Sequence, residues 1–430
     1  MAGQDLVGQR IKTMRRQRGL SQAQLAHPEL SDSYVSLIES GKRTPTPAVL
    51  ELLARKLDCS LTYLVNGVTA EQMREIELGL GYAHLAMENG EVAEARTRYA
   101  ELLADDGLAG LPQLRQEAEY GLALASQACG DLDAAIDLLN GLRGRDASEI
   151  SPERNIDVVT QLSRCYREKG ELALAVRIVE EVLGGADRPA WDDGLIRLGV
   201  QLLAAYIDRG DLLRAGHFCA ELVAAAEALG TPLALTLAHW EAAILASQTG
   251  QGEQAVAHFE RALAIQSEQG DPRRYARLRN DYAMIMLEIR PAEARAWRDL
   301  LLKVERELAE SSANAMDKMR CAMSIARAEL LLGSPEQAEL HIRPVLSMLD
   351  GMPEDMQADV RVLAGRALAE LGRAEEAVRE LEKATELLGP LPSTHFTTRS
   401  WLTAAEILER IDEHGRSVEA YRRALSGVGL

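Results

Sequence analysis

The pattern of apolar and polar positions predicts five short helices in the first 66 residues of the chain. Leu6, Val7, Ile11 and Met14 recur at helical spacing and line one face of the first helix, which Gly19 ends. Polar capping residues and stop signals divide the rest of the segment. They predict helices over 22–26 and 32–39, a fourth that begins at Pro47 and a fifth from Leu61 to Val65.

A period of forty residues organises the remainder of the chain. Eight repeats have a turn glycine between two predicted helices and a small alanine five residues later, which lets the helices approach closely. A fixed period of this length indicates stacked helix pairs, and nine pairs fit the chain, one of them a degenerate copy near 272–309. The turn glycines are Gly90, Gly130, Gly170, Gly210 and Gly250, with less regular copies at Gly333, Gly372 and Gly415.

Charge separates the two parts of the chain. Residues 1–66 hold nine Lys or Arg and six Asp or Glu, a balance of +3. The whole chain carries −18, so the remaining residues carry −21. Such asymmetry indicates a nucleic-acid-binding end on a body that would repel DNA.

Composition excludes several other classes of protein. The five cysteines lie far apart, without metal-ligand spacing, and are expected to be reduced core residues of a cytoplasmic protein. The sequence has no signal-peptide pattern and no apolar run long enough to span a membrane. We found no nucleophile–base pair, metal site or phosphate loop, so we expect neither an enzyme nor a cofactor.

The first 66 residues resemble the phage-repressor (Cro/C1, XRE) family of DNA-binding domains. The resemblance rests on Gly19-Leu20-Ser21-Gln22, Ile38-Glu39-Ser40-Gly41-Lys42-Arg43 and Leu64-Val65-Asn66-Gly67. One departure is His27-Pro28-Glu29-Leu30, which replaces the usual turn glycine in a connection about one residue shorter than is typical of the family. The resemblance implies that helix 32–39 reads the major groove and that Arg10 and Glu39 form a buried ion pair. The implied DNA-binding residues are Gln22, Asp32, Ser33, Tyr34, Ser36, Lys42 and Arg43.

Three roles in this segment stay open. Asp32 could accept a hydrogen bond from a cytosine amino group or help Ser31 to cap the helix. Tyr34 could reach a phosphate or join the core. The whole segment could also be a helical cap for protein interaction that never meets DNA.

The repeats resemble tetratricopeptide repeats (TPRs), although their period is longer than the 34 residues of that family. The first helix of each pair is expected to line the concave face. Arginine suits recognition of carboxylates, so the face could bind an acidic peptide or small ligand. Alternatively, these arginines pair with Asp157, Asp359 and other acids of neighbouring repeats. The predicted groove residues are Arg164, Arg167, Arg197, Trp240, Arg277, Asn280, Met284 and Arg327.

The expected fold is therefore all-α, with a lambda-repressor-like domain over residues 1–67 and a TPR-like α-solenoid over 68–430. This combination resembles the peptide-sensing RRNPP regulators of bacteria, which implies quorum sensing, an operator DNA, a peptide or small-molecule effector and a homodimer. We expect the C-terminal repeats, from about residue 390, to dimerise. Two alternatives remain: a TPR interaction scaffold with a vestigial head, and a regulator whose array only dimerises.

Overall fold

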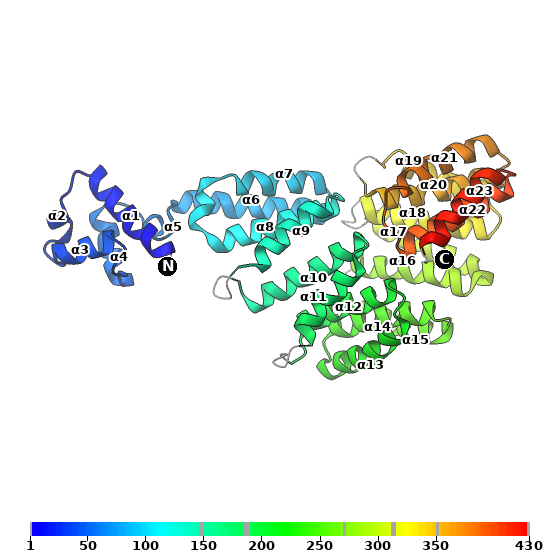
Figure 1. Ribbon diagram of the computed structural model, residues 1–430, viewed down its shortest axis with the longest axis horizontal. Helices are drawn as coiled ribbons and strands as arrows, with labels where there is room; N and C mark the ends of the chain where they lie inside the picture. Colours follow the sequence, from blue (N-terminus) through cyan, green and yellow to red (C-terminus); the bar gives the residue numbers. More distant parts are fainter. Residues whose placement is uncertain are drawn as a thin grey trace. The chain divides into compact units, whose positions relative to one another are not determined.

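The computed structural model describes residues 2–145, 150–184, 190–269, 272–310, 315–349 and 352–427, and the regular elements in these ranges are all helices. Contacts within the chain define two compact units (Figure 1). The first comprises residues 1–87 and 94–122, and the second 88–93 and 123–430. The expectation of an all-α protein is confirmed.

Five helices form the head at the positions that the sequence predicts. Ser21, Ser31, Thr46 and Ser60 each cap a helix by accepting a hydrogen bond from a backbone amide three residues later. These caps satisfy amides that a helix leaves without an internal partner. The helices are α1 (Ala2–Gln17), α2 (Gln22–Ala26), α3 (Asp32–Glu39), α4 (Pro47–Lys56) and α5 (Leu61–Asn66).

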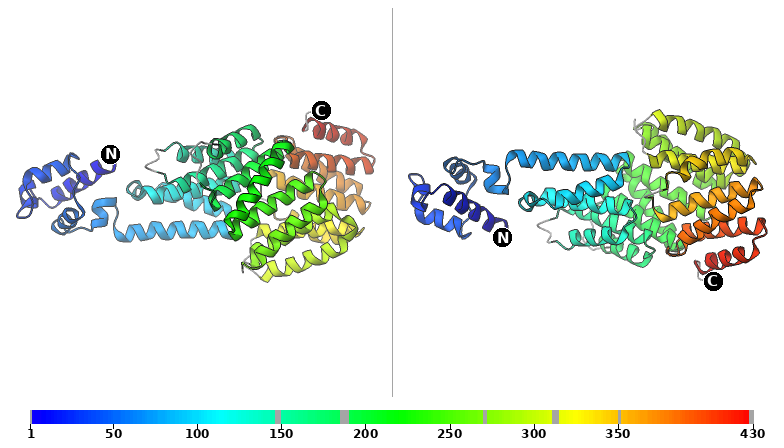
Figure 2. Two further views of the ribbon diagram at one scale, coloured as in Figure 1. Left: turned by 90° about the horizontal axis from the view of Figure 1, so that it is seen from below. Right: turned by 90° about the horizontal axis from the view of Figure 1, so that it is seen from above.

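Nine helix pairs follow in the described residues, as the forty-residue period predicts (Figures 1 and 2). The sixth pair is the degenerate copy, in which the short 3₁₀ helix η2 (Pro291–Glu293) replaces the glycine turn. The pairs are α6 (Ala70–Asn89) with α7 (Val92–Leu103), α8 (Pro112–Ala128) with α9 (Leu132–Arg143), α10 (Pro152–Glu168) with α11 (Leu172–Leu183), α12 (Asp193–Asp208) with α13 (Leu212–Leu229), α14 (Pro232–Gln248) with α15 (Gly252–Ser267), α16 (Pro272–Ile289) with α17 (Ala294–Glu310), α18 (Ala315–Leu331) with α19 (Pro335–Leu346), α20 (Glu354–Glu370) with α21 (Ala374–Leu388), and α22 (His395–Arg410) with α23 (His414–Gly427). Another 3₁₀ helix, η1 (Asp106–Gly110), joins the first two pairs.

The turn glycines adopt the left-handed conformation that ends each first helix. Gly90, Gly170 and Gly372, for example, have φ of 80°, 79° and 72°. The alanine five residues later is fully buried in each of these repeats, at Ala95, Ala175 and Ala377. Glycine reverses the chain without steric cost, and the alanine leaves room for the facing helix.

The last repeat corrects the sequence-based assignment of its turn. Gly415 lies inside α23, and Asp412 holds the left-handed position with a φ of 63°. Asp412 stands forty residues after Gly372, so the period persists while the glycine is lost. The glycine nearest to the expected position was therefore the wrong marker, because a short polar residue can also adopt this conformation.

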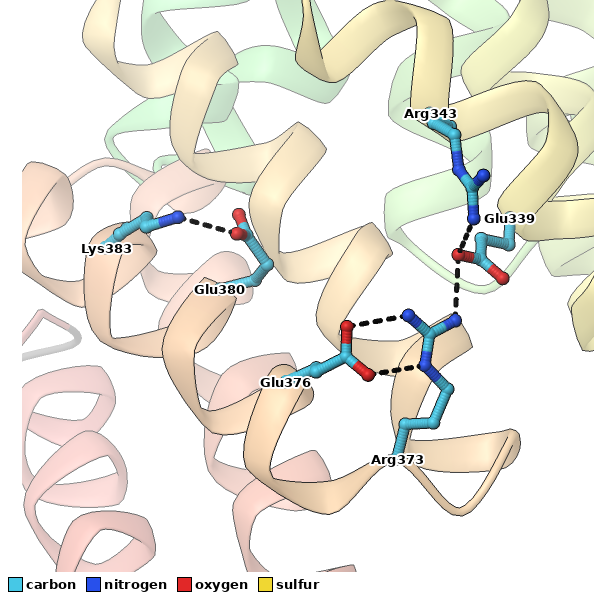
Figure 3. Close-up of polar contacts among 6 residues, drawn as sticks. All are labelled: Glu339, Arg343, Arg373, Glu376, Glu380 and Lys383. Carbon is cyan, nitrogen blue, oxygen red and sulfur yellow. Dashed lines mark hydrogen bonds and ion pairs between the residues drawn. The ribbon is translucent and has the colours of Figure 1, made fainter.

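Ion pairs reinforce the stacking of the later repeats (Figure 3). Arg373, at the start of α21, makes two hydrogen bonds to Glu376, of 2.7 and 2.6 Å, and one of 2.9 Å to Glu339 on α19. Arg343 also pairs with Glu339, at 2.6 Å.

A contact between distant segments occurs at Gly170, where a Cβ would lie 2.5 Å from the Cβ of Pro392.

Two further expectations concern the cysteines and the membrane. Cys165, Cys219 and Cys321 are buried, all five cysteines are free, and burial raises the pKa of Cys165 to about 12. Across the ranges that the structure describes, no helix has the length and apolar character needed to cross a bilayer.

Candidate nucleic-acid interface and array lining

Helix α3 is held on the head by one apolar face and presents the other to solvent. Val35 and Ile38 are buried in the head core, whereas Asp32, Ser33 and Ser36 are exposed. Ser31 provides the helix cap by accepting from the amide of Tyr34, at 3.2 Å. The three exposed residues lie on the face that we expect to read base edges, and their contact with DNA remains a prediction.

A glycine sets how closely α1 crosses α3. Gly8 is buried, and a Cβ at this position would lie 2.2 Å from the backbone oxygen of Ile38. No real Cβ tolerates that distance, so the crossing requires glycine on α1. The orientation of α3 thus depends on backbone packing as well as on its apolar side chains.

The buried ion pair of the head involves Arg15 instead of the expected Arg10. Arg15 donates to both carboxylate oxygens of Glu39, at 2.6 and 2.9 Å, and to the carbonyl of Leu20, at 2.8 Å. Burial alone would raise the pKa of Glu39, but hydrogen bonds from Arg15 and Gln22 outweigh it and hold that pKa below its usual value. Arg10 donates to the carbonyls of Leu64 and Val65, at 3.2 and 2.6 Å. Both arginines lie on α1, and the sequence does not show which of them faces α3.

Gln22 occupies the end of this network. Its Nε2 donates to Glu39 at 2.9 Å, and its side chain is half-buried. The predicted phosphate contact would therefore use an amide that Glu39 already orients. That role remains a prediction.

Lys56, on α4, supports the unusual turn before α3. Its ammonium donates to the carbonyls of Leu25, Ala26 and His27, at 3.1, 3.2 and 2.7 Å, and pairs with Glu29 at 2.5 Å. A cation at this end of α2 satisfies carbonyls that the helix leaves free. No local sequence signal identifies Lys56, because its partners lie about thirty positions away in the chain.

Basic and aromatic side chains border the outer face of α3. Lys42 and Arg43 are exposed, and the Arg43 guanidinium lies over the ring of Tyr34, 4.9 Å from its centroid. Tyr34 is half-buried and packs against the head core, whereas its contact with a phosphate remains a prediction. Tyr34 and Arg43 also line a shallow open pocket with Ser33 and Leu37. The arrangement offers a cationic edge beside the polar face of α3.

All five predicted groove arginines pair with acids, and two of them pair with the acids that the sequence suggested. Arg197 bonds Asp157 at 3.3 Å, and Arg327 bonds Asp359. Arg164 bonds Glu168 at 2.9 Å within one helix, while Arg167 reaches Asp208 at 2.8 Å and Arg277 reaches Asp317 at 3.0 Å. These five arginines therefore form ion pairs and do not present a bare cationic surface, while their place on the concave face remains a prediction.

The other predicted groove residues differ in their surroundings. Trp240 packs edge to face on Phe259, with centroids 4.7 Å apart, in the core between α14 and α15. Met284 contacts Arg327, with 3.8 Å between sulfur and nitrogen. Asn280 is buried; its amide nitrogen donates to Asp281 at 3.2 Å, while its oxygen has no partner among the described residues. Their part in ligand binding remains a prediction.

Buried acids accompany these arginines, and the sequence did not reveal them. Burial is the main cause that raises the pKa of Glu241 to about 7, and Asp208 adds to the shift while Arg167 opposes it. Burial also raises the pKa of Asp281 and of Asp355. Part of the array interior thus carries carboxyl groups whose charged form is disfavoured.

Two protein-family models match separate parts of the chain. A helix-turn-helix family model matches residues 11–64, and a tetratricopeptide-repeat model matches residues 358–387. The chain thus joins a helix-turn-helix domain of the XRE type to a TPR-like array. No protein in a search of curated sequences matches it.

Several solved structures match this chain at low sequence identity. A Rap protein complexed with Competence and Sporulation Factor is 11% identical, with a TM-score of 0.53 over 83% of this chain and 98% of that chain. Bacillus thuringiensis PlcR in complex with the peptide PapR7 and DNA is 15% identical, with a TM-score of 0.39 over 62% and 95%. Aspartyl phosphate phosphatase F from Bacillus subtilis is 13% identical, with a TM-score of 0.47 over 73% and 93%.

Proposed function

We propose that this protein is a transcription regulator that binds a DNA operator through α3 and senses an effector through its TPR-like array. The observation that carries the proposal is the exposed polar face of α3, with Asp32, Ser33 and Ser36, beside the exposed Lys42 and Arg43. Helices held in this way enter the major groove, where side chains at their N-terminal end reach base edges. The basic pair supplies two exposed cations of the kind that contact the phosphate backbone.

A salt titration tests the DNA-binding part. Replacing both Lys42 and Arg43 with alanine should weaken binding to every sequence and flatten the slope of log affinity against log salt by about two units. Arg177→Ala with Arg214→Ala is a matched control, because these exposed arginines lie on α11 and α13. The assay uses the full-length protein with DNA selected from a random library.

Changes on α3 itself should act differently. Ser33→Ala or Ser36→Ala should alter sequence preference, by about 1–3 kcal/mol per affected base pair, without changing the salt slope. Selection of a preferred sequence by each variant measures this effect. If the four changes leave DNA binding intact, the head is an interaction cap and the array a scaffold.

The effector part of the proposal is a peptide or small carboxylate ligand bound on the array lining. Supporting it are five arginines on first helices and the oxygen of buried Asn280, which has no partner among the described residues and can accept from a peptide amide. Because acids already pair with these arginines, a carboxylate ligand must exchange with an acid such as Asp208 or Asp359. Binding should change the DNA affinity by about 1–3 kcal/mol, and DNA should change the effector affinity equally.

Native mass spectrometry of the purified protein tests this part. We expect a retained anionic ligand that the Arg167→Gln change releases. The matched control is Arg177→Gln, because Arg177 lies on α11, the second helix of the same pair. Absence of any retained or added acidic ligand favours the alternative in which the arginines serve only to stack repeats and the array only dimerises.

A further inference from the structure

An apolar stripe on α6 is exposed, although the equivalent positions of later repeats pack against a neighbouring helix. Leu78, Tyr82 and Leu85 lie on one face of the helix and are 60%, 57% and 50% exposed. They stand 12, 8 and 5 residues before the turn glycine Gly90. Isolated exposed apolar residues are ordinary, but three in a row on one helix face form a patch.

The same positions are buried in later repeats. In α10 they are Val158, Leu162 and Cys165, all fully buried. In α12 they are Leu198, Leu202 and Ala205, with at most 3% exposed. These first helices pack against the second helix of the preceding pair, as α10 does on α9 and α12 on α11. The α6 stripe is therefore the repeat-stacking surface of a pair that no other pair precedes.

A glycine beside the stripe strengthens this comparison. Gly121 occupies in α8 the position that Gly81 occupies in α6. A Cβ at Gly121 would lie 2.4 Å from the ring of Tyr99, which comes from the preceding α7. A Cβ at Gly81 would meet nothing within 4 Å. The missing side chain of Gly81 thus leaves a notch on the surface of α6. A tyrosine ring fills the equivalent notch in the next repeat, whereas no atom of this chain fills the one at Gly81.

We propose that a second copy of this chain covers the stripe, by antiparallel packing of α6 on α6. This pairing is self-complementary, as a two-fold interface requires. Tyr82 enters the notch at the partner's Gly81, and Leu78 packs against the partner's Leu85. The same register brings Arg74 to the end of the helix that carries the partner's Glu88, so opposite charges meet.

The inference rests on the proposed function in one respect. The head and α6 as far as residue 87 belong to one compact unit, so pairing along α6 places two heads in a fixed relation. Two half-sites of an operator require such a pair. Three half-exposed side chains supply less than the roughly 800 Å² per partner of a standard interface, so we expect a micromolar dissociation constant.

Sedimentation velocity of the full-length protein across micromolar concentrations tests the proposal. We expect a concentration-dependent dimer that Tyr82→Glu or Leu85→Glu weakens by more than about tenfold, since each buries a charge in an apolar contact. Leu213→Glu is the matched control, because Leu213 on α13 is 78% exposed. Circular dichroism checks that each variant retains its helices.

Cross-linking tests the register independently. Under oxidising conditions Tyr82→Cys should form a covalent dimer, because the two-fold axis passes beside this residue, and Leu213→Cys should not. Both variants retain the five native cysteines, which controls for their reactivity. A cross-link yield for the Tyr82→Cys variant no higher than for the Leu213→Cys variant would overturn the antiparallel packing.

Three other outcomes decide the proposal. A wild-type protein that stays monomeric at high micromolar concentration overturns it, as does a Tyr82→Glu variant that dimerises normally. If removal of residues from 390 onward abolishes the dimer while Tyr82→Glu does not, the C-terminal repeats are the interface. A monomer that still binds DNA contradicts this inference alone, whereas a dimer that binds no DNA contradicts only the proposed function.

Discussion

At the scale of single residues, the molecule depends on ionisable groups withdrawn from water. Glu39 and Glu241 are both buried, but their surroundings differ. Glu39 has Arg15 and Gln22 as hydrogen-bond donors, and its pKa is held low. Glu241 has no comparable donor within the described part of the chain, and its pKa is raised to about 7. Lowering the pH should therefore destabilise the head, because Glu39 loses its charge. In the array it should instead remove the cost of keeping a charged Glu241 buried.

Glu39→Gln should destabilise the head by about 3 kcal/mol, because it leaves the Arg15 charge buried without its partner. In the wild type the contribution of Glu39 is complete above about pH 4.3 and is lost as the pH falls through the lower folded pKa. Hydrogen exchange of head peptides in the full-length protein measures both effects. Arg18→Ala, which breaks an exposed pair with Asp58, should cost less than about 1 kcal/mol.

Glu241→Gln should stabilise the array at pH 8 by about 3 kcal/mol and have little effect near pH 4.5. The folded pKa of Glu241 lies above the unfolded one, so the wild type loses stability as the pH rises between the two values. Thermal midpoints at the two pH values measure the difference, with exposed Glu260→Gln as the control. Equal shifts at both pH values would show that folding does not raise the pKa of Glu241.

At the scale of the helix pair, the turn determines how each repeat closes. Seven first helices end at glycines with positive φ, at residues 90, 130, 170, 210, 250, 333 and 372, and the last pair uses Asp412 for the same conformation. A residue with a Cβ pays a steric cost there that glycine avoids. The last pair should therefore be the one whose turn can be improved.

Asp412→Gly should stabilise α22 and α23 by up to about 1 kcal/mol, whereas Gly372→Ala should destabilise α20 and α21 by about 1–2 kcal/mol. One change removes a Cβ and the other adds one at equivalent turns with positive φ, so their effects on stability should have opposite signs. Hydrogen exchange of the four helices gives the comparison. Effects of the same sign would mean that side-chain contacts, not backbone conformation, dominate these turns.

At the scale of the whole molecule, the array is a succession of units that contact their neighbours. Core clusters span adjacent pairs, such as the one that joins α18 and α19 to α20. Stability in such arrays is approximately a sum of local and nearest-neighbour contributions. The contact of Gly170 with Pro392 is an exception, because it joins the third helix pair to the segment that precedes the last pair.

Leu381→Ala tests this locality, because Leu381 is buried in the cluster that joins α20 and α21 to α22. The change should cost about 2–5 kcal/mol and increase hydrogen exchange in α20 to α23. Exchange in α12 to α15 and in the head should stay as in the wild type. Loss of protection throughout the second unit would instead indicate a single cooperative fold.

Local structure in this protein follows from signals in the sequence. Caps such as Ser31, turn glycines such as Gly170 and the small residue after each turn act within a few positions, because they satisfy or bend the adjacent backbone. They were sufficient for five head helices, nine helix pairs and the degenerate sixth repeat. Where one such signal was replaced, as at Asp412, the period still located the turn although the residue type did not.

Which side chains meet depends instead on how the helices pack in three dimensions. Arg15 rather than Arg10 faces Glu39, Lys56 supports the turn before α3, and the groove arginines are each matched with an acid. These pairings depend on how one helix is rotated and placed against another, which no signal within a single helix specifies. For the same reason the sequence did not distinguish the α6 stripe from its buried equivalents, since their difference lies in whether a neighbouring pair is present.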